Sequence, residues 1–194
     1  MVSAEWGVFL GRWLRHPVQI AAANPSGPWV ARAMARQVRL DRRGHVLELG
    51  AGTGSLTAGL IEAGCPPEQL VMIERDPAFA ALLRRRFPHA TVIEGDATQV
   101  APLLAAHGIR ALASVVSSLP IKWFPVEAQE AIVRPALELA GSDGIFLQLT
   151  NAFASPLAAR RLGLDGREVE RVWRNFLPVQ IWAYRLLPAA GSPV

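Results

Sequence analysis

Three glycines, Gly50, Gly52 and Gly54, alternate with small residues in the stretch ELGAGTG, directly after a short apolar run. Glycine adopts left-handed backbone conformations without steric cost and lets another molecule approach the chain closely. Two acidic residues lie near the ends of later apolar runs: Glu74 closes the second run and Asp96 follows the third. Because open sheets of parallel strands bind ligands at the strands' carboxyl ends, we expect these groups to meet around one bound molecule.

The spacing of the glycines excludes two common nucleotide-binding motifs. The dinucleotide fingerprint G-x-G-x-x-G needs a small residue, glycine or alanine, three positions after its second glycine. Ser55 and Thr57 occupy the two places where that residue would stand. No Gly-Lys-Ser/Thr sequence follows the glycines, so a phosphate-binding P-loop is also excluded.

The elements that position these residues follow a regular order. From His45 onward, short apolar runs alternate with stretches of helical pattern, which predicts a parallel sheet with helices on both faces. After Thr150 the alternation stops, and two strands around Pro178 are expected to form an antiparallel hairpin at the end of the sheet. The predicted strands are 45–49, 70–74, 91–94, 112–117 and 144–150, the helices are 56–63, 77–87, 100–107 and 126–139, and the hairpin strands are 168–175 and 180–187.

The motifs, taken in this order, resemble those of class I S-adenosylmethionine-dependent methyltransferases. E-x-G-x-G-x-G ends the first strand, Gly95-Asp96-Ala97 follows the third, and Ser117-Ser118-Leu119-Pro120 follows the fourth. The resemblance implies a Rossmann-like three-layer α/β sandwich with a mostly parallel seven-stranded sheet and a terminal antiparallel hairpin. It also implies that S-adenosyl-L-methionine is bound and S-adenosyl-L-homocysteine released, with Glu74 on the ribose, Asp96 on the adenine amino group and Glu48 at the methionine end. The expected cofactor-binding residues are Ser26, Glu48, Leu49, Gly50, Ala51, Gly52, Gly54, Glu74, Arg75, Gly95, Asp96, Ala97 and Ser117.

The stretch after the fourth strand indicates the methyl acceptor. Adenine N6-methyltransferases, including the rRNA adenine dimethyltransferases that the chain resembles in outline, have Asn or Asp, then x-Pro, then Tyr or Phe. Here Ser118 replaces the amide that holds the base, and Ile121 replaces the ring that stacks on it. The chain is more similar to bacterial phospholipid N-methyltransferases, through its Ser-x-Leu-Pro motif, the loop Asn24-Pro25-Ser26-Gly27 and the terminal stretch RVWRNFLPVQIWAYR, although Ser118 stands where that family is expected to have glycine. This resemblance implies methyl transfer to the amine of phosphatidylethanolamine and its methylated derivatives, toward phosphatidylcholine.

The acceptor amine must lose a proton before it can attack the methyl group. None of the four histidines follows a strand end, so we expect catalysis by positioning and desolvation. An aromatic face suits the growing quaternary ammonium and a basic side chain suits the lipid phosphate; for Tyr184 the alternative is a core aromatic in the last strand. The expected catalytic residues are Ser117, Ser118, Leu119 and Tyr184, the expected substrate-binding residues are Lys122, Trp123, Tyr184 and Arg185, and no metal is expected.

The first 43 residues are strongly basic. Seven arginines stand there against Glu5 and Asp41, a net charge of +5, whereas the whole chain carries +4. Apolar residues recur at helical spacing within residues 5–15, which predicts an amphipathic helix in the membrane interface, or alternatively one docked on its own domain. The expected division is a membrane-binding helix and a basic cap helix in 1–43, the methyltransferase core in 44–188 and a tail in 189–194. The expected membrane residues are Trp6, Phe9, Leu10, Arg12, Trp13, Leu14 and Arg15.

The composition of the sequence indicates in which cellular compartment the protein works and which partners it has. The sequence has 51% hydrophobic residues but no uninterrupted apolar stretch of about 18 residues, so we expect no membrane-spanning helix. The single cysteine, Cys65, cannot form a disulfide within the chain, and the first ten residues lack the pattern of a secretory signal. We therefore expect a cytoplasmic monomer, peripheral on the cytoplasmic face of the inner membrane, that binds phospholipid and the anionic membrane surface and no nucleic acid.

Two other functions remain open at this point. The basic N-terminal segment is also typical of a nucleic-acid patch, as in an rRNA or DNA adenine N6-methyltransferase. A protein that keeps the fold and binds lipid without catalysis is the second alternative, against which the complete cofactor motif argues.

Overall fold

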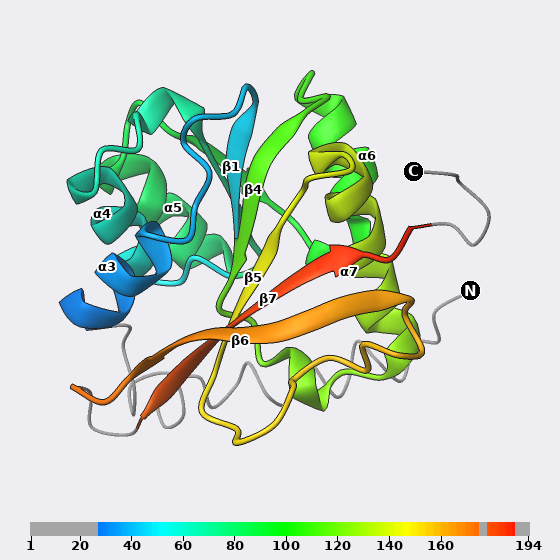
Figure 1. The fold of residues 1–194 in the computed structure, drawn as a ribbon. Coiled ribbons are helices and arrows are strands. Elements are labelled where there is room, and N and C mark those ends of the chain that lie inside the picture. The colour runs from blue at the N-terminus through cyan, green and yellow to red at the C-terminus, as the bar shows by residue number, and fades with distance from the viewer. Residues whose placement is uncertain (1–26, 175–177, 189–194) are drawn as a thin grey trace.

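The computed structural model describes residues 27–174 and 178–188 of the 194-residue chain, and Figure 1 shows their arrangement. A seven-stranded sheet forms the centre, in the order β3-β2-β1-β4-β5-β7-β6. The first five strands are parallel, and β7 pairs antiparallel with both β5 and β6. The strands are β1 (His45–Leu49), β2 (Leu70–Glu74), β3 (Thr91–Glu94), β4 (Leu112–Ser117), β5 (Phe146–Thr150), β6 (Leu164–Val172) and β7 (Val179–Leu186).

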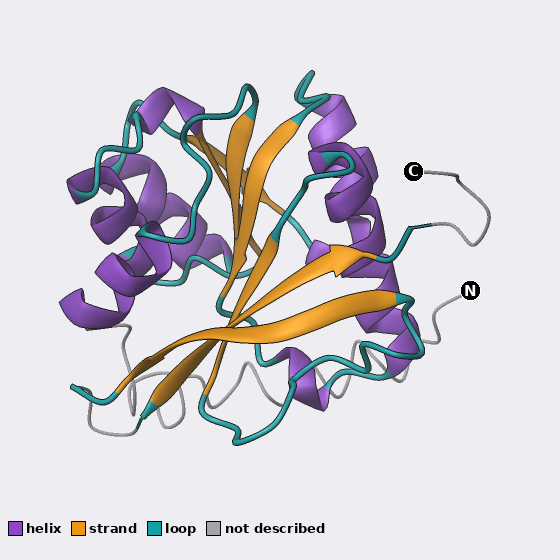
Figure 2. Cartoon of the chain, in the orientation of Figure 1, coloured by secondary structure: helices purple, strands orange, loops and turns teal. Residues whose placement is uncertain are grey.

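Helices cover both faces of the sheet, and Figure 2 shows the two groups on either side of the strands. One apolar cluster joins the sheet to α3 and α4, and a second joins it to α6 and α7. This is the predicted fold class, a three-layer α/β sandwich with a terminal antiparallel hairpin. The helices are α3 (Pro28–Ala35), α4 (Ser55–Glu62), α5 (Pro77–Arg86), α6 (Val100–Ala106) and α7 (Val126–Ala140), with short 3-10 turns η1 (Pro67–Gln69), η2 (Ala97–Gln99) and η3 (Ile121–Trp123).

The central strands are buried on both faces, as continuous apolar runs predict for a parallel sheet. Every residue of β2 and β4 is buried. The predicted strand bounds hold for β1 to β4, whereas β6 begins at Leu164, four residues before the predicted start at residue 168. The sequence did not indicate this earlier start, because Gly166 lies within the strand and glycine normally weakens a strand. Here a Cβ at Gly166 would come within 2.4 Å of the Tyr184 ring, so the glycine leaves room for that side chain.

The two edge strands differ from the central ones. β3 is only four residues long, and its last residue, Glu94, is exposed. Charged residues recur along β6, which also has a shift in register between Glu168 and Glu170. Short length, charge and irregular pairing are the features by which natural sheets block further strands from adding at an edge.

Helix α3 lies where the basic cap helix was expected, and it packs on the core. Its residues Val30, Ala33 and Met34 are almost completely buried against α4 and the sheet. The expected amphipathic helix within residues 5–15 and the expected tail lie outside the described residues. Within residues 27–174 and 178–188, no helix is long and apolar enough to cross a membrane.

The packing of α3 on α4 depends on Gly59. A Cβ at this position would come within 2.1 Å of the Cβ of Ala31. We expect Gly59→Ala to lower the free energy of unfolding by about 2 kcal/mol in urea denaturation, because overpacking outweighs alanine's better helix propensity of about 1 kcal/mol.

Adding Ala31→Gly provides the control for this prediction. It removes one of the two clashing methyl groups, so the double variant is expected to be more stable than the two single changes sum to. An unchanged unfolding midpoint in Gly59→Ala alone would contradict the close helix contact.

Candidate functional site

The glycine turn follows β1 at the carboxyl edge of the sheet. Gly50 and Gly52 both have left-handed backbone, with φ of 74° and 53°. A Cβ at Gly50 would come within 2.6 Å of the Leu119 side chain, whereas a Cβ at Gly52 would meet nothing within 4 Å. Gly50 is therefore required by the protein's own packing, and Gly52 lines open space in which a ligand fits close to the backbone. Gly54, with φ of 80°, lies against Phe87.

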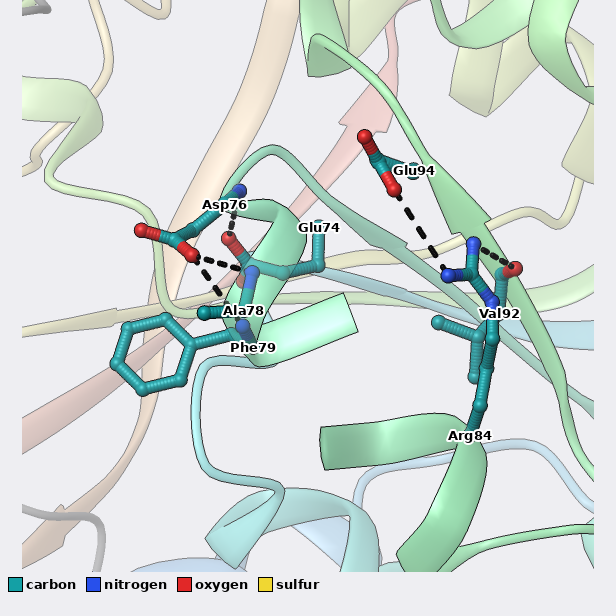
Figure 3. Close-up of polar contacts among 7 residues, drawn as sticks. All are labelled: Glu74, Asp76, Ala78, Phe79, Arg84, Val92 and Glu94. Carbon is teal, nitrogen blue, oxygen red and sulfur yellow. Dashed lines mark hydrogen bonds and ion pairs between the residues drawn. The ribbon is translucent and has the colours of Figure 1, made fainter. Parts of the chain in front are cut away.

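Glu74, the last residue of β2, holds this turn in place. Its carboxylate oxygens accept the backbone N–H of Gly52 at 2.8 Å and that of Asp76 at 2.9 Å. Figure 3 shows the second bond, beside the cap in which Asp76 accepts from the N–H groups of Ala78 and Phe79 at the start of α5. Because a carboxylate oxygen can accept two hydrogen bonds, Glu74 keeps capacity for ligand hydroxyls.

The neighbouring acid on β3 has a different environment. Glu94 pairs in register with Glu74 but is exposed, and it forms an ion pair with Arg84 at 3.7 Å (Figure 3). Both are glutamates at strand ends, yet only Glu74 is buried and bound to the glycine turn. Glu94 therefore provides a natural comparison for the role of Glu74.

Glu48 lies beneath the turn and is fully buried. One of its oxygens accepts the Thr57 hydroxyl at 2.6 Å, and the other, Oε1, has no hydrogen-bond partner among the described residues. Burial raises the pKa of Glu48 to about 8, with a smaller contribution from the nearby Glu74 carboxylate. A buried carboxyl group with one unpaired oxygen suits a cationic partner such as an ammonium group, which would favour its ionised form.

Asp96 and Arg75 connect the loops after β3 and β2. Asp96 caps η2 by accepting the backbone N–H and the hydroxyl of Thr98 at 2.9 and 2.8 Å. Its other oxygen lies 3.6 Å from Arg75 Nη1. Gly95 is closed on one side by Leu103, and Ala97 is half-buried in η2. The two loops thus meet at the same edge as the glycine turn.

The stretch after β4 contacts the glycine turn directly. The Ser118 hydroxyl donates to the carbonyl of Gly50 at 2.7 Å, and the Ser118 N–H donates to the carbonyl of Leu49 at 3.2 Å. Ser117 is buried, and its hydroxyl accepts the N–H of Leu119 at 3.3 Å. Hydrogen bonds therefore link the glycine turn, where the methyl donor is predicted to bind, to the loop that is predicted to hold the methyl acceptor.

Gln148 belongs to this site, although the sequence analysis did not identify it. It is fully buried on β5, opposite Ser117 in the register, and its amide donates to the carbonyl of Leu119 at 2.8 Å. The same amide donates to the carbonyl of Leu149 at 2.7 Å, while its oxygen is buried and has no hydrogen-bond partner within the described part of the chain. A polar residue inside the apolar run 144–150 is the signal that could have identified it, because buried amides need hydrogen bonds.

The predicted acceptor residues after Pro120 lie on η3. Ile121 is 1% exposed and packs into the core. Lys122 and Trp123 are exposed, with the Lys122 ammonium 5.0 Å from the centre of the Trp123 ring. The aromatic side chain nearest in sequence to the acceptor loop therefore points to solvent, under a cation.

Tyr184 and Arg185 lie elsewhere. Tyr184 is fully buried and pairs in register with Phe146, at the amino end of β5 and away from the carboxyl edge. Its hydroxyl is 2.8 Å from that of Ser155, and burial raises the pKa of Tyr184 to about 12. Arg185 is one residue further along β7, opposite Asp165. This placement corrects the expectation that Tyr184 faces the acceptor, because a core aromatic and a site aromatic have the same sequence pattern in a strand.

The remaining residues named in the sequence analysis are either buried or outside the described part of the chain. Leu49 and Ala51 are buried on either side of Gly50. The free cysteine, Cys65, is buried, and burial raises its pKa to about 11, as expected for an inert thiol. Ser26 and the predicted membrane residues Trp6, Phe9, Leu10, Arg12, Trp13, Leu14 and Arg15 lie outside the described residues.

The described residues fit S-adenosylmethionine. The open space at Gly52 accommodates a ligand against the backbone, and the unpaired oxygen of Glu48 suits the methionine ammonium. Glu74 has acceptor capacity for ribose hydroxyls, and Asp96 lies on the neighbouring loop at the adenine end. Among the described residues, no group of three or more His, Cys, Asp or Glu side chains could hold a metal.

The raised pKa of Glu48 predicts a dependence of stability on pH. The folded state holds this proton more tightly than the unfolded chain, so the resulting stability is full below the ordinary glutamate pKa of 4.5 and is lost as the pH rises to about 8. Over that window, we expect the wild type to lose stability relative to Glu48→Gln by up to about 1.4 kcal/mol per pH unit in urea denaturation. A difference that stays constant from pH 5 to pH 8 would show that Glu48 is ionised in the folded protein.

Comparisons with known proteins agree with this geometry. Residues 27–161 match the family model described as ribosomal RNA adenine dimethylase. An ornithine lipid N-methyltransferase of Singulisphaera acidiphila is 37% identical over 149 residues, which cover 75% of this chain and 78% of the relative. A probable ribosomal RNA small subunit methyltransferase A of Halobacterium salinarum is 41% identical over 78 residues, 40% of this chain but only 26% of the relative.

Solved structures share the fold at low sequence identity. A TehB-like SAM-dependent methyltransferase from Corynebacterium glutamicum superposes with a TM-score of 0.59 and 17% identity, over 95% of this chain and 99% of that one. The magnesium protoporphyrin IX methyltransferase from Synechocystis PCC 6803, solved with bound SAM, gives a TM-score of 0.59 and 15% identity, over 81% of this chain and 79% of that one. The matched family model, the lipid N-methyltransferase relative and the site geometry together place the chain in the ribosomal RNA adenine dimethylase family, as an S-adenosylmethionine-dependent N-methyltransferase.

Proposed function

We propose that this protein transfers methyl groups to the amine of phosphatidylethanolamine and its methylated derivatives, toward phosphatidylcholine, at a membrane surface. The burial of Ile121 is the observation that carries the proposal, because it leaves the base-stacking position of the adenine enzymes inside the core. Ser118, at the position of the base-holding amide, donates its hydroxyl to Gly50. With both base-reading groups absent, an amine outside a nucleobase is the better acceptor.

The lipid class is supported by the similarity to the ornithine lipid N-methyltransferase, which extends over most of both chains. That relative's name gives a second candidate substrate, an amine-bearing lipid without the phosphoethanolamine headgroup. Both candidates present a primary amine at the membrane surface. They differ in the phosphate, for which the exposed Lys122 beside the acceptor loop is the available cation.

S-adenosylmethionine, when bound, supplies an electrophilic methyl group. The chain must place the amine in line with it and admit the amine without its proton. The described histidines cannot remove that proton, because His45 begins β1, His89 precedes β3 and His107 precedes β4, all at the amino edge of the sheet. We infer that Ser117, Ser118 and the peptide groups up to Leu119 position the amine, while exclusion of water favours its neutral form.

Reaching a lipid headgroup requires attachment to the membrane. The predicted amphipathic helix within residues 5–15 would supply buried aromatic area, and the arginines of residues 1–43 would be attracted to anionic lipids at about 1 kcal/mol each near the surface. We propose reversible, peripheral attachment on the cytoplasmic face of the inner membrane, by a monomer.

The role of Glu74 is testable by cofactor binding. Glu74→Ala removes the acceptor for the Gly52 N–H and for the ribose hydroxyls, and we expect S-adenosylmethionine to bind at least about 1 kcal/mol more weakly in isothermal titration calorimetry. Glu94→Ala is the matched control, since it removes the same side chain from the neighbouring strand end at an exposed position. Equal losses in the two variants would remove Glu74 from the cofactor site.

The acceptor is testable with labelled S-adenosylmethionine. The protein is incubated separately with vesicles containing phosphatidylethanolamine, vesicles containing ornithine lipid, and small-subunit ribosomal RNA. We expect label in phosphatidylethanolamine. Label in ornithine lipid alone would show that the substrate is ornithine lipid and not phosphatidylethanolamine. Label in RNA alone would refute a lipid substrate.

A further inference from the structure

Large apolar side chains are exposed at five positions in the described residues. Four of them are aromatic, which is unusual because aromatic side chains are mostly buried in soluble domains. The exposed fractions are 48% for Trp29, 67% for Trp123, 83% for Phe153, 66% for Trp173 and 53% for Leu187.

Topology places three of the aromatic side chains at one edge of the sheet. Trp123 follows the carboxyl end of β4, and Phe153 follows that of β5. Since β7 is antiparallel to both β5 and β6, β6 runs in the same direction as β5, and Trp173 also lies beyond a carboxyl end. In Figure 1 these ends lie on the lower side of the sheet, with that of β6 at the far left. It is the edge that carries the glycine turn and the acceptor loop.

The fourth aromatic residue joins this edge through contacts between α3 and the end of β6. The guanidinium of Arg174 lies 5.0 Å from the centre of the Trp29 ring. Arg36, which follows the last residue of α3, forms an ion pair with Glu170 of β6. The start of α3 and the end of β6 accordingly lie close together in Figure 1. We call Trp29, Trp123, Phe153 and Trp173 the aromatic rim.

Cations accompany three of the four rim residues. Besides Arg174, the guanidinium of Arg32 lies 5.6 Å from the Trp29 ring centre. Lys122 lies 5.0 Å from the ring of Trp123, and Arg171 lies 5.6 Å from that of Trp173. The acids near α3 and the end of β6 are paired, Glu168 with Arg171 and Glu170 with Arg36. Arg32 and Arg174, which lie over Trp29, form no ion pair with an acid among the described residues, and this part of the rim is therefore positively charged.

We propose that the aromatic rim is a docking surface for an anionic lipid bilayer, separate from the predicted helix within residues 5–15. Tryptophan rings have an apolar body and a polar N–H, and they favour the boundary between headgroups and acyl chains. Arginine and lysine beside them keep their charge in water while their stems follow the apolar surface. The positive charge complements anionic headgroups.

The position of the aromatic rim determines which side of the protein faces the bilayer. The side chains come from four separate elements around one edge, so the edge itself faces the bilayer. That orientation directs the glycine turn and the acceptor loop toward the headgroups, and in this respect the inference rests on the proposed function. A nucleic-acid surface fits less well, since the aromatic residues are distributed around the edge and do not form a continuous stacking platform.

Leu187 provides a matched control. It follows β7, which runs opposite to β5, so this exposed apolar side chain lies at the other edge of the sheet. Phe153→Cys, Trp173→Cys and Leu187→Cys are prepared in the full chain and labelled with an environment-sensitive fluorophore. The native Cys65 is 2% exposed and has a raised pKa, so it does not compete for the label.

The labelled proteins are mixed with vesicles of phosphatidylcholine and phosphatidylglycerol, which lack the proposed substrate. We expect a blue shift of emission at positions 153 and 173 and none at 187. Co-sedimentation without a shift at 153 and 173 would place attachment elsewhere, and equal shifts at all three would indicate non-specific adsorption. A blue shift with RNA in place of vesicles would show that the rim binds RNA. Labels that are already shielded before vesicles are added would show that another part of the same chain covers the rim.

A second measurement tests the energetic contribution. We expect Phe153→Ser with Trp173→Ser to weaken partitioning into these vesicles by about tenfold through lost apolar burial, and Leu187→Ser to leave it unchanged. Methyl transfer to detergent-dispersed lipid should be equal in all these proteins. Equal partitioning in the double variant and Leu187→Ser would refute the proposal that the rim docks on the bilayer. Normal docking without any methyl transfer to lipid would instead refute the proposed substrate and leave the rim intact.

Discussion

The parallel pairing of β1 with β2 and β4 is the constraint on which the site depends. Leu49 pairs in register with Ile73 on one side and with Ser117 on the other, so three strands end at the same level. The loops that follow are then close enough for two side-chain hydrogen bonds, from the Gly52 N–H to Glu74 and from Ser118 to Gly50. The donor site and the acceptor loop are therefore held by the same strand register.

The acids at this edge illustrate how environment divides the roles of one residue type. Glu48 is fully buried, has one oxygen without a partner in the described ranges, and has a pKa raised to about 8. Glu74 is buried but accepts two backbone N–H groups, and Glu94 is exposed beside Arg84. The buried, uncompensated carboxyl group costs stability that a cationic ligand can restore. The site thus combines a poorly satisfied group under the turn with a well satisfied one that holds it.

The sequence predicted those features that depend on local pattern. The strands, the glycine turn and the placement of Glu74 follow from periodicity, glycine spacing and the rule that ligands bind at carboxyl ends. Gln148 was missed because its role depends on which strand lies beside β4. Tyr184 was misplaced because its register against Phe146 decides its position. The contact between Arg174 and Trp29 joins residues far apart in the chain, and no local pattern indicates it.

If the protein works at a membrane surface, as proposed, its edge strands have a further consequence. Adsorption to a bilayer concentrates molecules in two dimensions, where strand addition between copies becomes a route to aggregation. β3 is too short to template a long partner, and the charged, irregularly paired β6 presents a poor ladder to another chain. The sheet therefore ends at both sides in strands that discourage self-association under crowded conditions.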